Sequence, residues 1–376
     1  MSYLETEIHE QPTVLRRLLA REAENLQRLA EQFGGRFDYV VIAARGSSDN
    51  AARYAQYLFG AQNGLPVSLA TPSLYSLYSR PPSLKGALVI GISQSGQSPD
   101  IVSVVAAGRA QGCPTLAITN DSQSPLATVA EDYILLHAGE ERAIAATKTY
   151  TASLGAIALL SATLPASPLS AAQKGEEAIS LGWTVPAPST FGTESGMGTT
   201  RAIENLQLLP ALMEHAIENV LPILPRVERY RYMAHCVVIG RSYNYATAFE
   251  IALKIKELTR VVAEPYSSAD FRHGPIAMVR DGFPVLLVAP SGIVFEDLRT
   301  LADDLKKIDS ELIIISDNLA LLEQAHLALP LPQGVPEYLS PLVTVIAGQL
   351  FSLTLAEAKG LNPDNPEGLR KVTETR

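Results

Sequence analysis

The stretch FEIALKIKELTRVVAEPYSSADFRHGP, residues 249–275, begins with the pattern of a helix that is apolar over most of its circumference. At about 100° per residue, Glu250, Lys254 and Glu257 fall in one narrow wedge of that helix. Because a helix that is apolar nearly all round is expected to be buried, these charged groups must face a partner, a cavity or one another. The alternative interpretation is an ordinary Glu–Lys pair on a solvated stripe.

The same stretch continues into an RHGP turn that carries His273. Histidine is the side chain whose charge changes near neutral pH. Carboxylates, an ammonium group and an imidazole together can give and take protons, which favours a chemical site over a solvated stripe. We therefore predict that Glu250, Lys254, Glu257 and His273 belong to the chemical centre of the protein.

The composition is typical of a globular protein with a well-filled core. With 376 residues, 47% of them hydrophobic and 18% charged, the chain is long enough for two domains of ordinary size. The formal net charge of −9 argues against nucleic acid or an anionic membrane surface as a partner. An anionic small molecule can still bind, because phosphate sites use local N–H and hydroxyl groups.

The termini and the cysteines point to a cytoplasmic protein. Cys113 and Cys236 lie far apart within apolar runs, which predicts neither a disulfide framework nor a metal site. The N-terminal sequence MSYLETEIHEQP is acidic and polar, unlike a signal peptide. We find no apolar run that approaches the ~18 residues needed to span a membrane.

Short apolar runs separated by helical segments follow an expected N-terminal helix at 13–33. The runs are continuous instead of alternating, as in strands buried on both faces of a parallel sheet. Alternation of strand and helix over this length indicates a doubly wound α/β domain. The predicted strands are DYVVIAA (38–44), PVSLA (66–70), GALVIGIS (86–93), PTLAIT (114–119) and DYILLH (132–137).

Two of these strands end in Ser-rich loops, RGSS at 45–48 and SQSGQS at 93–98, that turn directly into helices. In open α/β sheets, ligands bind at the carboxyl ends of strands, where a helix N-terminus offers free N–H groups to an anion. Serine is also a common cap and turn residue, which is the better interpretation for either loop alone. Two such loops in one domain favour a phosphate site, although neither matches the nucleotide-binding G-x-x-x-x-G-K-[ST] pattern. The candidate phosphate-binding residues are Gly46, Ser47, Ser48, Ser93, Gln94, Ser95, Gly96 and Ser98.

The second half of the chain looks like a degenerate copy of the first. GRS at 240–242 follows a strand as RGSS does, but no Ser-rich second loop is present. The internal repeat predicts a second doubly wound domain with a parallel sheet. Its predicted strands are HCVVIG (235–240), VVAE (261–264), FPVLLVAP (283–290), ELIIIS (311–316) and HLALP (326–330).

The remaining segments connect or follow these two domains. The segment 140–162 predicts an apolar helix with Lys148 at its entry, where the lysine suits a structural contact as well as a substrate. The Pro-, Gly- and Ser-rich segment 181–200, with Trp183, predicts a loop. A long apolar helix is predicted at 340–358. We expect an N-terminal helix at 1–34, a first domain at 35–165, a connecting region at 166–230, a second domain at 231–360 and a tail at 361–376.

The motifs RGSS, SQSGQSPD, ALKIKE, AEPYSSADFRHGP and a lysine-bearing tail, in this order, resemble the sugar isomerase (SIS) domain family over residues 38–376. The resemblance is to tandem SIS domains, as in the isomerase half of glucosamine-6-phosphate synthase. It implies two flavodoxin-like, three-layer αβα domains with parallel sheets.

The resemblance also implies roles for individual residues. Phosphate would be bound by Ser47 or Ser48 together with Ser93, Gln94, Ser95 and Ser98. Glu257 would move a proton between C1 and C2 of a sugar, with Glu250 and Lys254 lining the site. His273 would open the sugar ring from the partner subunit of a homodimer, and Lys371 in GLRKVTET would close over the sugar. No cofactor and no metal ion are implied.

Within the family, SQSG-x-SPD, SSA-x-F-x-HGP and NPD-x-P-x-GL-x-KVT resemble the SIS-type glucosamine-6-phosphate deaminases most closely. Residue 2 is Ser and the first strand begins near residue 38, so we expect no glutaminase domain. The implied reaction converts glucosamine 6-phosphate and water to fructose 6-phosphate and ammonia. The alternatives are a fructosamine-6-phosphate deglycase, a galactosamine phosphate deaminase, a plain aldose–ketose isomerase and a non-enzymatic sugar-phosphate sensor.

Overall fold

The computed structural model describes residues 1–164 and 199–371. The loop predicted at 181–200 therefore lies outside the described residues except at its end, where α8 begins at Thr199. The ten predicted strands are all present. They are β1 (Tyr39–Ala43), β2 (Val67–Leu69), β3 (Ala87–Ile92), β4 (Thr115–Thr119), β5 (Asp132–Leu135), β6 (His235–Gly240), β7 (Val262–Ser267), β8 (Pro284–Val288), β9 (Glu311–Ser316) and β10 (Leu327–Pro330).

The helices alternate with these strands, as the sequence predicts. The α-helices are α1 (Tyr3–Phe33), α2 (Ser47–Leu58), α3 (Ser73–Ser76), α4 (Pro99–Ala110), α5 (Pro125–Val129), α6 (Lys148–Thr163), α8 (Thr199–Val220), α9 (Tyr243–Thr259), α10 (Ser268–Arg272), α11 (Phe295–Lys307), α12 (Leu319–Leu322) and α13 (Pro341–Ala358). A π-helical turn, η1 (Phe59–Asn63), and three 3₁₀ segments, η2 (Leu221–Tyr230), η3 (Pro275–Met278) and η4 (Glu337–Leu339), complete the described elements.

The strands form two five-stranded parallel sheets, with orders β2-β1-β3-β4-β5 and β10-β9-β8-β6-β7. In the first sheet the strand order reverses between β1 and β3, and in the second between β6 and β8. Ligands of doubly wound sheets bind at such switch points, beyond the carboxyl ends of the strands. The predicted doubly wound fold of both halves is confirmed. The loops at 45–48 and 93–98 follow β1 and β3, so they flank the first switch point.

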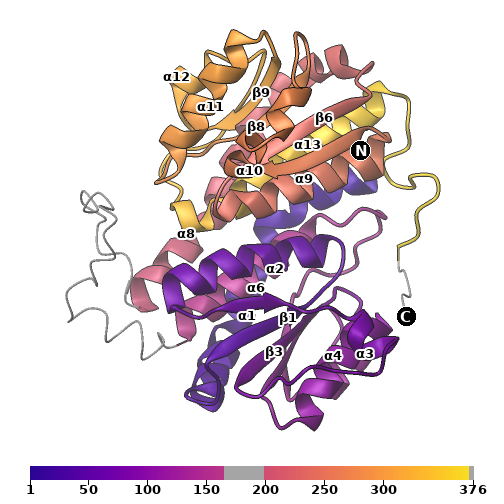
Figure 1. The fold of residues 1–376 in the computed structure, drawn as a ribbon, viewed down its shortest axis with the longest axis vertical. Coiled ribbons are helices and arrows are strands. Elements are labelled where there is room, and N and C mark those ends of the chain that lie inside the picture. Colours follow the sequence, from indigo (N-terminus) through magenta and orange to yellow (C-terminus); the bar gives the residue numbers. More distant parts are fainter. Residues whose placement is uncertain (165–198, 372–376) are drawn as a thin grey trace.

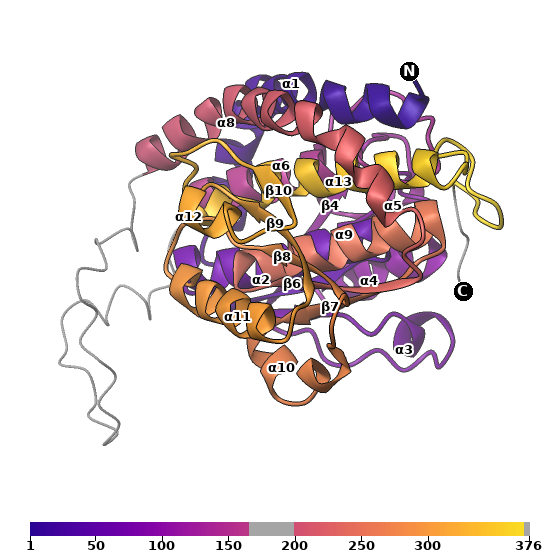
Figure 2. The same ribbon diagram turned by 90° about the horizontal axis from the view of Figure 1, so that it is seen from above.

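The two sheets lie on either side of a shared layer of long helices, and shorter helices cover their outer faces (Figure 1). One core cluster spans both halves and draws on α1, α2, α6, α8, α9 and α13. Two smaller clusters fill the outer faces of the sheets, beneath α4 and α11. Figure 2 shows α1 and α8 along one edge of the molecule and α10 at the opposite edge.

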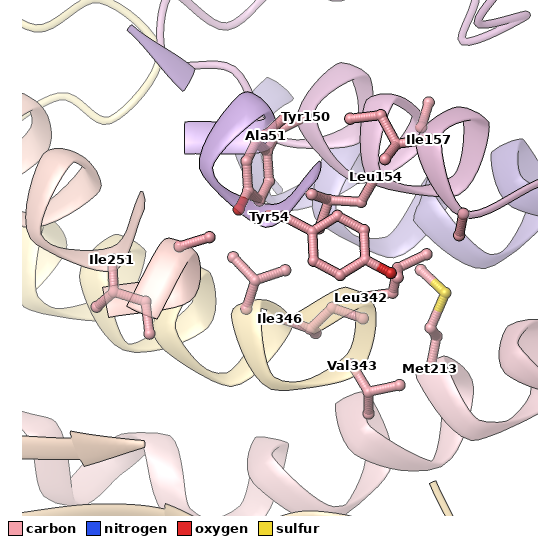
Figure 3. Packing of buried hydrophobic residues seen from close by; sticks show 14 of the residues in the cluster. Ala51, Tyr54, Tyr150, Leu154, Ile157, Met213, Ile251, Leu342, Val343 and Ile346 are labelled. Carbon is pink, nitrogen blue, oxygen red and sulfur yellow. The ribbon is translucent and has the colours of Figure 1, made fainter. Parts of the chain in front are cut away.

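The shared helical layer joins the two halves into one unit. In Figure 3 apolar side chains from five of its helices meet, and the labelled ones are Ala51, Tyr54, Tyr150, Leu154, Ile157, Met213, Ile251, Leu342, Val343 and Ile346. Burying a side chain of this size contributes about 1.5–3 kcal/mol. The relative position of α2 and α9, which belong to different sheets, is therefore fixed by core packing.

The helix α1 extends ten residues further toward the N-terminus than the predicted segment 13–33, and it contains Pro12. Proline removes the N–H that would bond the carbonyl of Ile8, four residues earlier. The side-chain amide of Gln11 donates to that carbonyl at 2.9 Å. The replacement hydrogen bond explains why the helix continues through a residue that usually ends one.

The helix α13 corrects one expectation from the sequence. By length and composition it could cross a membrane, with a mean hydropathy of 1.4 over 18 residues, although we expected no such run. The helix itself was predicted at 340–358, but Thr344, Gln349 and Ser352 divide it into shorter apolar runs. In the structure 83% of this window is buried among the helices of the shared layer. Such burial is that of a core helix, so the segment is weak evidence for a membrane span.

Candidate active site

The charged wedge of α9 forms a compact cluster at the junction of the two domains. Lys254 Nζ lies 2.5 Å from Glu257 Oε2 and 3.5 Å from Glu250 Oε1. The side chains of Glu250 and Lys254 are 0% and 1% exposed, whereas that of Glu257 is 24% exposed. The three predicted residues are therefore brought together as expected, and Glu257 is the carboxylate of the wedge that opens outward.

The first domain holds the inner carboxylate of this wedge. From α2, Ser47 Oγ donates to Glu250 Oε1 at 2.9 Å and Asn50 Nδ2 donates to Glu250 Oε2 at 2.7 Å. Lys254 Nζ also donates to Ser47 Oγ at 3.3 Å. Burial raises the pKa of the Glu250 carboxyl, although Lys254 and these two donors oppose the rise. The cluster thus depends on side chains from both domains.

Lys254 is positively charged in this environment. Burial alone would lower its pKa, but the carboxylates of Glu257 and Glu250 outweigh burial and place the pKa above its usual value. The wedge therefore presents a partly exposed carboxylate beside a buried cation, which is an arrangement suited to a general base.

The two Ser-rich loops meet at the switch point of the first sheet. The helices α2 and α4 begin with Gly46 and Ser98 as caps, and neither cap makes a side-chain hydrogen bond to its helix. The N–H groups of Ser48 and Asp49 nevertheless donate to the carbonyl of Arg45, and that of Ile101 donates to Asp100 Oδ1. The remaining N–H groups at the two helix starts are the ones that can bind an anion. Gly46 and Gly96 have positive φ angles of 56° and 63°. A Cβ atom on Gly96 would lie 2.2 Å from Ser124 Oγ, so the second loop requires glycine there.

The serines of these loops differ in their surroundings. Ser47 is committed to Glu250 and Lys254, whereas Ser48 Oγ makes no hydrogen bond within residues 1–164 and 199–371. In the second loop Ser93 Oγ accepts from Gly96 N at 3.1 Å, and Ser95 Oγ accepts from Gln97 N at 3.3 Å. The sequence left open whether Ser47 or Ser48 binds phosphate, and this geometry favours Ser48.

The tail lysine, Lys371, is bound to the segment that contains Glu141 and Ala143. Lys371 Nζ donates to Glu141 Oε2 at 2.9 Å and to the carbonyl of Ala143 at 2.6 Å. Burial alone would raise the pKa of Glu141, but Lys371 and donors from Thr147 and Thr149 outweigh it, so the pKa lies below its usual value. The negative charge of Glu141 also contributes to the raised pKa of Lys254.

His273 does not take part in the hydrogen bonds of this cluster. It follows α10, its side chain is exposed, and within the described residues no hydrogen bond joins it to Glu257 or Lys254. The preceding residue, Arg272, is fixed by Asp297, with its Nη1 2.7 Å from Oδ1. Within the described residues, no hydrogen bond or ion pair therefore links His273 to the wedge.

Two residues of the site were missed in the sequence, and one candidate has another role. Asn50 lies one helical turn from Ser47, so a polar i, i+3 pair in an Ala-rich helix was the available signal. Glu141 gave no local signal, because its partner Lys371 lies 230 residues away. Lys148 is 3% exposed and pairs with Glu10 at 2.6 Å, which is a structural contact.

The fold is that of a tandem α/β protein with two Ser-rich loops at the switch point of one domain and a Glu–Lys–Glu cluster on a helix of the other. The model of the SIS domain matches this chain twice, at residues 38–162 and 232–357. The chain therefore belongs to the SIS domain family.

Three known proteins illustrate the similarity. The glutamine–fructose-6-phosphate aminotransferase (isomerising) of Gloeobacter violaceus is 32% identical over 373 residues, which cover 97% of this chain but 57% of that protein. A second similar protein is a phosphosugar isomerase, by its assignment, from Silicibacter pomeroyi DSS-3. Its crystal structure is 29% identical in sequence and has a TM-score of 0.79, and the match covers 97% of this chain and 100% of that one. A glucosamine-6-phosphate deaminase from Thermotoga maritima, 20% identical with a TM-score of 0.74, covers 100% of both chains and shows the fold alone.

Proposed function

We propose that the protein is a cytoplasmic amino-sugar phosphate deaminase that converts glucosamine 6-phosphate and water to fructose 6-phosphate and ammonia. The observation that carries the proposal is the partly exposed carboxylate of Glu257, 2.5 Å from the buried ammonium of Lys254, beside the anion loops of the other domain. The curated relatives named as aminotransferases that use fructose 6-phosphate support an amino-sugar phosphate as the substrate class.

The proposed reaction uses positioned acids and bases. The loops at 45–48 and 93–98 bind the 6-phosphate through helix N–H groups and hydroxyls, with Ser48 free to contribute. Glu257 removes the C2 proton of the open-chain amino aldehyde while O1 gains a proton, which gives an enaminol. Glu257 then returns its proton at C1 while the nitrogen loses one, which gives a C2 imine with a C1 hydroxyl group. Water then adds to C2 and ammonia leaves. Lys371 closes over the sugar from the tail.

We propose a homodimer in which His273 of the partner subunit opens the sugar ring. The support is the exposed position of His273, which makes no hydrogen bond to the wedge of its own chain within the described residues. A ring-opening residue must reach the sugar oxygen by a hydrogen bond or through one water. A second copy of the chain is the simplest source of such a contact.

The test is incubation of the purified protein with glucosamine 6-phosphate in the absence of glutamine. Ammonia and fructose 6-phosphate are assayed in the same samples, with the Glu257→Gln variant as the inactive reference. Glu323, an exposed residue beyond α12, provides the matched Glu→Gln control that should keep full activity. Formation of both products in equal amounts supports the deaminase.

Other outcomes separate the alternatives. Ammonia-free conversion of glucose or mannose phosphates would indicate a plain isomerase. Release of an amine from fructosamine 6-phosphate, with no turnover of glucosamine 6-phosphate, would indicate a deglycase, and turnover of galactosamine 6-phosphate would identify the other amino sugar. Tight sugar-phosphate binding without any turnover would contradict an enzyme and point to a sensor.

A further inference from the structure

Asp364, in the tail, binds the beginning of α1. Its carboxylate accepts hydrogen bonds from the backbone N–H groups of Tyr3 and Leu4, at 3.0 and 2.8 Å. These groups have no partner inside the helix, and a carboxylate near them interacts favourably with the helix dipole. The contact joins residues that are 361 and 360 positions apart in the sequence. The tail is thus anchored seven residues before Lys371.

Glu7, one turn further along α1, holds a second segment. Its carboxylate accepts from the backbone N–H of Arg142, in a short hydrogen bond, and from that of Ala143 at 3.3 Å. Glu7 is 4% exposed, and burial raises the pKa of its carboxyl. A buried carboxylate that accepts two backbone N–H groups fixes the path of the segment that donates them.

The segment 141–144 has no regular secondary structure, yet it is bonded on both sides. On one side lies Glu7 of α1. On the other side Ile144 N donates to the carbonyl of Asp364 at 3.3 Å, and Lys371 Nζ bonds Glu141 and Ala143. The first two turns of α1, the segment 141–144 and the tail therefore form a closed ring of contacts that ends at the Lys371 ammonium.

We propose that Asp364 and Glu7 are positioning residues for Lys371, through which the N-terminal helix sets the place of the tail lysine in the site. This inference rests on the proposed function, in which Lys371 closes over the sugar. Neither residue touches the wedge or the anion loops in the contacts described above. Their loss should therefore affect the catalytic step and leave phosphate recognition intact.

The test compares Asp364→Asn and Glu7→Gln with Glu5→Gln, a matched control in the first turn of α1 whose side chain makes no hydrogen bond among the described residues. Amide hydrogen exchange of residues 361–371 and 141–147 is measured together with steady-state kinetics. We expect faster exchange in both segments for Asp364→Asn and Glu7→Gln. We also expect about a 10-fold lower kcat with KM within about two-fold, since small misplacements of a catalytic group can cost up to 10²-fold. Glu5→Gln should change neither quantity.

Unchanged exchange in the folded Asp364→Asn variant would overturn the inference, and so would faster exchange with an unaltered kcat while Lys371→Ala is inactive. Retained activity in Lys371→Ala would instead show that the role of Lys371 in the proposed function is wrong. If Glu7→Gln does not fold, Asp364→Asn alone decides, because its side chain lies at the surface end of α1 and not in the core.

Discussion

Gly46 and Ser242 hold the same unusual backbone conformation at equivalent places in the two domains. Gly46 precedes α2 with φ 56° and ψ −132°, and Ser242 precedes α9 with φ 55° and ψ −128°. Each follows an arginine that pairs with an aspartate near the start of another helix of the same domain. Arg45 lies 2.8 Å from Asp100 of α4, and Arg241 lies 3.4 Å from Asp297 of α11. The second domain has thus kept the turn of the first, although glycine has been replaced.

The first prediction concerns this turn. A non-glycine residue at this φ costs about 1–3 kcal/mol. Ser242→Gly should therefore raise the free energy of unfolding by roughly 1 kcal/mol, because Ser242 makes no side-chain hydrogen bond to α9 that would be lost. Gly46→Ser should lower it by a similar amount. Chemical denaturation measures both, and a less stable Ser242→Gly variant would contradict the assignment of strain.

The second prediction concerns the buried ammonium. Lys254→Met leaves Glu250 and Glu257 without their cation, and breaking a buried pair costs about 3–5 kcal/mol. The loss should be larger at pH 8 than at pH 5.5. Burial already raises the pKa of Glu250, so the folded state binds its proton more tightly than the unfolded state and becomes less stable as the pH rises. Removing Lys254 increases that effect.

The control for this experiment is Lys256→Met, two residues along the same helix, where the side chain is exposed. Its unfolding free energy should change by less than about 0.5 kcal/mol at both pH values. Equal losses for the two variants, or a loss at position 254 that does not depend on pH, would contradict a buried charge cluster.

The third prediction separates the two adjacent serines. Ser48→Ala should raise KM for the sugar phosphate about 10- to 150-fold with little change in kcat, because it removes one hydrogen bond to a charged group, worth about 1.5–3 kcal/mol. Ser47→Ala should lower kcat and stability, because Ser47 bonds Glu250 and Lys254. Steady-state kinetics and thermal denaturation of the two variants test this division. The opposite pattern would assign phosphate binding to Ser47.

The fourth prediction tests the origin of the ring-opening residue. Glu257→Gln should abolish turnover while phosphate-dependent binding persists, and His273→Asn should also be nearly inactive. If His273 serves the site of the partner subunit, unfolding and refolding an equal mixture of the two inactive variants restores about 25% of wild-type activity, since half of the dimers are hybrids with one intact site. A mixture that stays inactive would place His273 in the site of its own chain.

Much of the fold followed from the sequence because the strands are buried on both faces and read as continuous apolar runs. The largest error in a strand was at β7, predicted as 261–264 but extending to Ser267 through Pro265. β7 is the last strand in the order of the second sheet, so it lies at an edge. An edge strand tolerates the N–H that Pro265 lacks. Periodicity alone does not reveal which strand lies at the edge.

The site was predictable where its residues share one helix and not where they meet across the fold. The spacing of Glu250, Lys254 and Glu257 gave their common face directly. The contacts of Lys371 with Glu141 and of Asp364 with α1 depend on tertiary packing over more than 200 residues, so no local pattern contains them. The side-chain hydrogen bond from Gln11 to the carbonyl of Ile8, which replaces the one that Pro12 cannot make, also could not be predicted from a local pattern.

The distribution of the site over two domains also matters for protein engineering. The loop at 93–98 has no hydrogen bond to the charged wedge in the described residues, whereas Ser47 and Asn50 reach into it. A combinatorial library confined to residues 93–98, with Gly96 kept, can therefore vary this loop while the buried charges stay in place. A library that includes residues 47 and 50 would select for stability and for recognition at the same time.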